Sequence, residues 1–121
     1  MMKSIPVWKQ ELSDGVHAAR LASLYCCSPA ETASEAARYT AVLDGLEKTF
    51  GSHAEAGLYS APGRTEIGGN HTDHQHGRVL AGSVNIDMIA AAAPNDKNQL
   101  RVQSEGYDLC VIDLNDLEAR D

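Results

Sequence analysis

The chain has 121 residues, of which 43% are hydrophobic and 22% charged, and it carries a formal net charge of −7. A chain of this length forms one domain at most, and its composition argues against wholesale disorder. The excess of acidic residues argues against a nucleic acid or an anionic membrane as partner, because both attract positive charge. No apolar run approaches the ~20 residues of a membrane-spanning helix, so no membrane partner is expected.

The first ten residues contain lysines but no apolar stretch of the kind found in a secretory signal. The chain has an odd number of cysteines, and their spacing is not that of zinc ligands. They are Cys26, Cys27 and Cys110. We therefore expect free, mostly buried thiols in a reducing compartment, and the predicted localisation is cytoplasmic.

Two helices are predicted in residues 1–51. Residues 7–25 show an amphipathic pattern, which Gly15 weakens near its start. Residues 28–31 form a capping box with proline at the first helical position. The helix that follows carries one apolar stripe and ends at Gly51. The stripe consists of Tyr39, Val42, Leu43, Leu46 and Phe50.

Extended structure is predicted after residue 56. A short strand over 57–61 would end at Pro62, and residues 63–77 have no periodicity and are predicted to form a loop. Strands are then expected within 82–93, at 100–102 and over 109–114, with a turn at 94–98. The prediction is an α+β fold in which an antiparallel meander is covered by the two helices. The expected organisation is helical over 1–51, strand and loop over 57–77, and antiparallel strands over 78–121.

Residues 61–77 carry most of the chemical information in the chain. Glycines frame the cation Arg64, and a run of hydrogen-bonding groups follows them: Asn70, His71, Thr72 and Asp73. An ionised aspartate only accepts hydrogen bonds, whereas asparagine and histidine can both donate and accept. Vicinal hydroxyls need this mixture, because each hydroxyl donates once and accepts up to twice. The stretch is typical of a sugar or polyol site with an arginine beside it.

The same stretch resembles the signature of galactokinases, the sugar-kinase branch of the GHMP kinases, commonly Gly-Arg-Val-Asn-Leu-Ile-Gly-Glu-His-Thr-Asp-Tyr. The twelve residues over 63–74 align with it without a gap. Six positions differ from the pattern. Val-Asn becomes Thr65-Glu66, Leu-Ile becomes Ile67-Gly68, Glu becomes Asn70, and Tyr becomes His74. Flanking stretches at 38–51, 60–62 and 77–85 also resemble the family. The matching positions are Gly63, Arg64, Gly69, His71, Thr72 and Asp73.

The resemblance implies helices packed on a mostly antiparallel sheet, as in the N-terminal domain of GHMP kinases, a fold shared with the second domain of a ribosomal protein. It implies that the chain is the N-terminal portion of a longer enzyme that phosphorylates the anomeric hydroxyl of galactose. That parent would bind Mg²⁺ and ATP. Arg64 would stabilise the transition state, and the 70–73 run would bind the sugar. Glu66 and His74 are further possible contacts.

The chain departs from the family pattern in ways that matter for function. The glutamate that meets the C6 hydroxyl in the family is Asn70 here, so the anionic acceptor is missing. No glycine- and serine-rich phosphate cradle precedes a helix, and the family's catalytic aspartate lies beyond that cradle. The carboxylates over 113–121 are a solvated charge run. We therefore expect the chain alone to bind no nucleotide and to be inactive.

Other interpretations of these residues stay open. The chain could be a non-catalytic sugar-binding module, or part of a kinase for a C6-modified sugar such as galacturonate. Structurally, Arg64 could bridge loop carbonyls, Asp73 could cap a turn, and Asn70 could occupy a positive φ. A metal site would have to be built from His71, Asp73, His74 and His76. Ligands so close in sequence rarely reach one ion, so no metal is expected.

Overall fold

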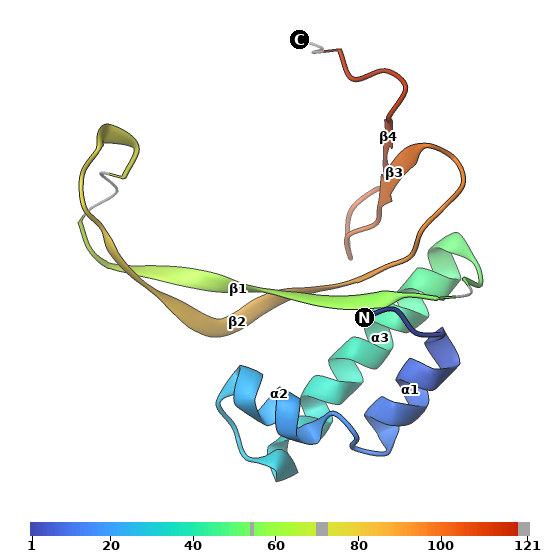
Figure 1. Ribbon diagram of the computed structural model, residues 1–121, viewed down its shortest axis with the longest axis horizontal. Helices are drawn as coiled ribbons and strands as arrows, with labels where there is room; N and C mark the ends of the chain where they lie inside the picture. The colour runs from blue at the N-terminus through green and yellow to red at the C-terminus, as the bar shows by residue number, and fades with distance from the viewer. Residues whose placement is uncertain (54, 70–72, 119–121) are drawn as a thin grey trace.

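The computed structural model describes residues 1–53, 55–69 and 73–118, and its elements form an α+β arrangement (Figure 1). The helices are α1 (Ile5–Ser13), α2 (Ala18–Tyr25) and α3 (Thr32–Phe50), with short 3-10 turns at Pro29–Glu31 and Asp73–Gln75. The strands are β1 (Gly57–Gly68), β2 (Leu80–Ala92), β3 (Gln99–Val102) and β4 (Cys110–Asp113).

The single helix predicted over 7–25 is wrong, because the chain forms two helices there. Gly15 lies between them in the left-handed region, with φ +72°. A residue in this conformation cannot continue a right-handed helix, and glycine adopts it without a steric penalty. The weak position seen in the sequence is therefore a break that lets α2 turn against α3.

The second predicted helix, which is α3 in the structure, is confirmed. The Glu31 carboxylate accepts hydrogen bonds from the backbone N–H of Ser28 at 2.9 Å and from its hydroxyl at 2.7 Å. Proline occupies the first position, and this first turn is a 3-10 turn that leads into α3. Gly51 ends the helix at φ +83°. Along α3, Tyr39, Leu43 and Leu46 are buried on the predicted stripe.

The core lies between the three helices and the first part of β1. Trp8 is buried, and its indole N–H donates to the carbonyl of Ala56 at 2.8 Å. This bond satisfies the polar atom that a buried tryptophan brings with it. A backbone bridge between Lys3 and Ala56 holds the start of the chain at the same place. The buried hydrophobic residues are Ile5, Trp8, Leu12, Leu21, Tyr25, Tyr39, Leu43, Leu46 and Ala56.

The pairing of β1 with β2 forms a long antiparallel ribbon that Figure 1 shows running from beside α3 out to the 69–79 connection. Strand structure was expected at 82–93 and is confirmed. The prediction of a short strand ending at Pro62 and a loop from residue 63 is wrong, since β1 continues to Gly68. The register shifts immediately after Pro62, which opposes Asp87. Proline is tolerated inside a strand next to such a bulge, where the regular ladder of hydrogen bonds is interrupted.

The predicted continuous meander is also wrong. The four strands form two separate pairs, β1 with β2 and β3 with β4. Pro94 follows β2 without a backbone N–H to donate, and the Asn95 side chain accepts from the Lys97 N–H at 3.0 Å. Asn98 then adopts φ +45°. This turn leads β3 away from β2, and Arg101 on β3 lies 5.1 Å above the ring of Phe50 at the end of α3.

The cysteines are free, but the expectation that they are mostly buried is wrong. Cys26 and Cys110 are exposed, and Cys27 is half-buried. Cys26 occupies the left-handed cap of α2 at φ +53°, a position that faces solvent. Among the described residues, no helix has the length and hydrophobicity needed to cross a membrane.

One carboxylate connects the helices to the ribbon. Asp87 on β2 accepts hydrogen bonds from the Tyr25 hydroxyl at 2.6 Å, the Ser60 hydroxyl at 2.5 Å and the Arg38 guanidinium at 2.8 Å. The single proton of Tyr25 goes to Asp87, so Tyr39 donates to Tyr25 across 3.0 Å. The Asp87 side chain is 3% exposed. This network joins α2, α3, β1 and β2.

The network shifts the pKa values of its members. Burial alone would raise the pKa of Asp87, but the hydrogen bonds from Ser60, Tyr25 and Arg38, together with the guanidinium charge, lower it overall. Burial and the hydrogen bond to Asp87 raise the pKa of Tyr25 above its ordinary value. The ionised form of Asp87 and the neutral form of Tyr25 are the pair that this site stabilises.

These shifts predict how stability depends on pH. Because folding lowers the pKa of Asp87, the charged network stabilises the fold above the unfolded pKa of about 3.9 and loses this effect as pH falls through the folded value. Asp87→Asn should lower the free energy of unfolding by about 1.5–3 kcal/mol at pH 7. We expect this difference from the unsubstituted chain to shrink below about pH 4, as measured by urea unfolding.

The matched control is Glu35→Gln, which removes the other carboxylate of Arg38 at the helix surface and leaves the ribbon contact intact. A partly exposed ion pair between neighbouring turns of one helix contributes ~0.2–1 kcal/mol. A cost for Asp87→Asn that stays constant from pH 7 to pH 3 would contradict the prediction.

Candidate functional site

The described residues of the predicted site lie on the far part of the ribbon and in its connection. Arg64 is exposed on β1 opposite Ser83, and Glu66 is half-buried opposite Ala81. Asp73 begins the 3-10 turn that continues through exposed His74. The predicted contacts Asn70, His71 and Thr72 lie outside the described residues. The structure therefore brings Arg64 and Glu66 onto one strand that leads directly into the signature loop, residues 69–79.

Two register shifts shape this part of the ribbon. The first falls between Pro62 and Arg64, where the partner moves from Asp87 to Ser83, so β2 carries the extra residues. Gly63 sits at this bulge, and a Cβ there would lie 3.1 Å from Val84 Cγ2 and 3.2 Å from the Ile86 carbonyl. The second shift falls between Glu66 and Gly68. Bulges increase the local twist and change where side chains point, so they set the direction of Arg64.

Gly69 closes the base of the signature loop. Its φ is +106°, and a Cβ at this position would lie 2.4 Å from the Arg78 carbonyl oxygen and 2.6 Å from Val79 Cα. Both atoms belong to the backbone, so they cannot rotate away as a side chain could. The two ends of the loop approach this closely only because residue 69 is glycine. Sequence reasoning recorded Gly69 as a matching position, but only the fold shows what it does.

This geometry predicts the effect of a single methyl group. Gly69→Ala should separate the loop ends and cost on the order of 1–3 kcal/mol through backbone strain at positive φ. Gly68→Ala is the matched control, because a Cβ at position 68 meets nothing within 4 Å and its φ is not positive. Amide chemical shifts of residues 77–80 should change in the first variant and stay in place in the second. Equal effects in the two variants would show that the close approach is unimportant.

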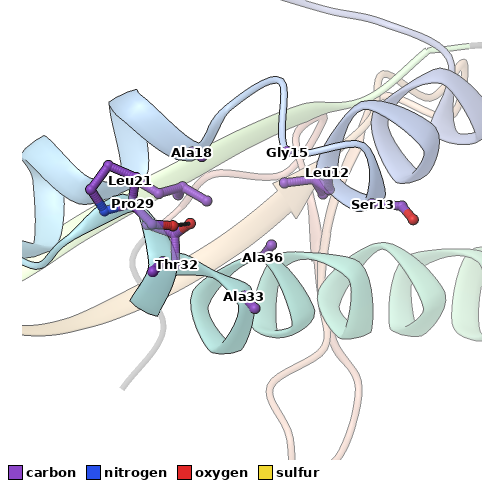
Figure 2. A pocket seen from close by; sticks show the side chains of 10 residues that line it. Leu12, Ser13, Gly15, Ala18, Leu21, Pro29, Thr32, Ala33 and Ala36 are labelled. Carbon is purple, nitrogen blue, oxygen red and sulfur yellow. Dashed lines mark hydrogen bonds between the residues drawn. The ribbon is translucent and has the colours of Figure 1, made fainter.

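Two hollows in the described structure lie away from this site. One, of about 210 Å³, is formed by the end of α1, by α2 and by the start of α3 (Figure 2). Figure 2 shows that its walls are largely small or apolar side chains, including Leu12, Leu21, Ala33 and Ala36. The other, of about 640 Å³, lies between α1, α2 and the start of β1, with Trp8, Arg20 and Tyr59 in its wall. Neither is lined by a residue of 61–77.

The metal hypothesis receives no support from the described residues. Within them, no group of three or more His, Cys, Asp and Glu residues could hold an ion. His71 belonged to the proposed set and lies outside these residues.

The ribbon and loop correspond to a known family signature. Residues 46–94 match the family model described as the galactokinase galactose-binding signature. This part of the chain is similar to the galactose-binding signature of galactokinases. The match begins near the end of α3, covers β1, the loop and β2, and ends at Pro94.

Curated relatives agree with this match. The chain is 36% identical over 78 residues to the galactokinase of Ligilactobacillus salivarius, which is 62% of this chain and 20% of that protein. It is 31% identical over 85 residues to the galactokinase of Lactococcus lactis subsp. cremoris, covering 68% of this chain and 21% of that protein. It is 34% identical over 71 residues to the galactokinase of Streptococcus suis, covering 56% of this chain and 18% of that protein.

The chain thus spans about a fifth of the length of the curated relatives it matches. No solved structure matches it. Sequence reasoning identified the signature residues but missed Asp87, whose role depends on partners far away in the chain. The sequence offered no signal for it, because the apolar alternation of Val84, Ile86 and Met88 puts Asp87 on the polar side of a strand. In the structure Ile86 and Met88 are exposed, and Asp87 lies on the half-buried side.

Proposed function

We propose that this chain is the sugar-binding part of a galactokinase-type enzyme of the GHMP kinases, which transfers a phosphoryl group from ATP to the anomeric hydroxyl of galactose. The observation that carries the proposal is the family match, together with the structural unit on which it falls. The galactokinase galactose-binding signature covers residues 46–94. Within this match, β1 and β2 form the ribbon that carries Arg64 and leads into the signature loop.

In this proposal the signature residues divide two tasks. The 70–73 run binds the sugar hydroxyls, with Asp73 as the anionic acceptor. Arg64 presents a planar, positively charged guanidinium, which can pair two phosphoryl oxygens at once. Charge of this kind stabilises the phosphoryl group most as negative charge develops on its oxygens.

Nucleotide binding is assigned to residues outside this chain. The sequence has no glycine- and serine-rich phosphate cradle ahead of a helix, the kind of loop that commonly binds nucleotide phosphates. The chain alone is proposed to bind sugar without turning over ATP.

The sugar-binding proposal is tested by titrating this chain with galactose in a calorimeter. Asp73→Ala should weaken binding by about 1.5–3 kcal/mol, the contribution of hydrogen bonds to a charged group. Asp73→Asn should weaken it less, because the amide oxygen still accepts. Asp108→Ala is the control, since this exposed aspartate lies between β3 and β4 rather than in the signature. If all these variants have the same affinity for galactose, Asp73 does not bind the sugar.

A second candidate substrate follows from Asn70, which replaces the glutamate of the common signature. A glutamate repels the carboxylate of a C6-oxidised sugar, whereas a neutral amide does not and can donate to it. Asn70 therefore favours tolerance of galacturonate or of 6-deoxygalactose.

Substitution at this position tests the second candidate. Asn70→Glu should raise the ratio of galactose affinity to galacturonate affinity, because it restores like-charge repulsion at C6. Asn70→Gln lengthens the side chain without adding charge and should leave the ratio nearly unchanged. Calorimetric titration with both sugars measures the ratio. A ratio that Asn70→Glu does not alter would show that position 70 does not contact C6.

A further inference from the structure

The ribbon contacts the helices along only part of its length. The ribbon residues that pack on the helical core are Leu58, Ile89 and Ala91, all near the Gly57 end of the pairing. Asp87 lies on the same face of β2, two residues further along, opposite Pro62. Figure 1 shows the ribbon continuing past the helices towards the signature loop. Asp87 therefore marks the place where the ribbon leaves the helical layer.

The contacts at Asp87 have a direction that apolar packing lacks. Its Oδ2 accepts from Tyr25, at the end of α2, and from Ser60, its diagonal neighbour on β1. Its Oδ1 accepts from Arg38 on α3, whose guanidinium lies 5.7 Å from the centre of the Tyr25 ring. An aliphatic side chain could fill this space at lower desolvation cost. Three directional bonds from three elements instead fix one orientation of the strand.

Arg64 lies just beyond this point. The last pair before the first bulge is Pro62 with Asp87, and the first pair after it is Arg64 with Ser83. Any rotation of β2 at Asp87 is therefore passed directly to the strand segment that carries Arg64 and then to the loop. Because the ribbon projects from the helices, a small change of angle at its base becomes a larger displacement at its end.

We propose that Asp87 is a positioning residue, which orients the ribbon against the helices through Tyr25, Arg38 and Ser60 and so places Arg64 and the ribbon end at Gly69 for substrate. The part of this proposal that concerns substrate rests on the proposed function. Asp87 touches no substrate itself, and it acts through the angle at which the ribbon leaves the helical layer.

The experiment compares four variants of this chain, all measured well below their unfolding temperatures. Asp87→Ala removes the whole network, and Asp87→Asn places an amide opposite Arg38 and disturbs that contact. Tyr25→Phe deletes one hydroxyl with little change of shape. Glu35→Gln is the control, because it removes the other partner of Arg38 and leaves the ribbon contact. Two quantities are measured: backbone amide spectra by nuclear magnetic resonance and the Kd for galactose.

The expected result separates positioning from stability. Amide signals of residues 63–68 and 80–84 should shift or broaden in the Asp87 variants and in Tyr25→Phe, while those of α3 outside the contact keep their positions. Galactose Kd should rise roughly 2- to 30-fold, the range for residues that modulate a binding site at a distance. Asp87→Ala should show the largest change, and Glu35→Gln should leave both quantities unchanged.

A purely structural role gives a different result. If the folded Asp87→Asn and Tyr25→Phe variants unfold at lower temperature but keep the amide signals of 63–68 and the galactose Kd, the positioning proposal is wrong. Should Asp87→Ala fail to fold, these two milder variants still decide the question. If the unsubstituted chain does not bind galactose, the proposed function fails, and the amide signals alone then support or overturn the orienting role of Asp87.

Discussion

The buried carboxylate of Asp87 is the interaction on which the arrangement of helices and ribbon depends. Apolar packing of Leu58, Ile89 and Ala91 brings the ribbon onto the helical core, but such packing is non-directional. Hydrogen bonds weaken steeply when their angles change. The contacts of Asp87 to Tyr25, Ser60 and Arg38 therefore select one orientation among those that apolar packing would allow.

This network also joins residues inside the family match to residues that precede it. The galactose-binding signature covers residues 46–94 and includes Ser60 and Asp87. Tyr25 and Arg38 lie before it, on α2 and on the part of α3 that precedes residue 46. The carboxylate on the signature ribbon is thus satisfied by donors from the preceding helices. The helices are more than a cover for apolar residues, because they complete the polar contacts that the ribbon needs at its base.

Where the ribbon extends beyond the helices, its shape is determined by backbone geometry more than by side-chain packing. Gly63 lies at a bulge that leaves little room beside Val84 and the Ile86 carbonyl, and Gly69 allows the backbone at Arg78 and Val79 to approach. A projecting ribbon has few neighbours to define its shape, so turns and bulges must define it. Glycine is suited to both positions, since a Cβ would be crowded at the first and would collide with backbone at the second.

The sequence by itself determined the local features and the kind of site. The capping box at Ser28, the apolar stripe of α3 and its end at Gly51 depend on neighbours within a few residues, so they could be predicted correctly. The signature residues, with Arg64 and Asp73 among them, could be recognised for the same reason, because their order and spacing carry the information. The α+β class followed from helical periodicity at the start of the chain and alternation later.

Only the tertiary structure decided how these pieces are joined. The break at Gly15 and the continuation of β1 through Pro62 depend on what the chain packs against, and the separation of β3 and β4 from the ribbon depends on the turn after Pro94. The role of Asp87 could not be predicted, because its partners at 25 and 38 are distant in sequence and meet it only when α2 and α3 pack on the ribbon. Local pattern specifies which elements form, whereas long-range hydrogen bonds and packing specify their mutual orientation.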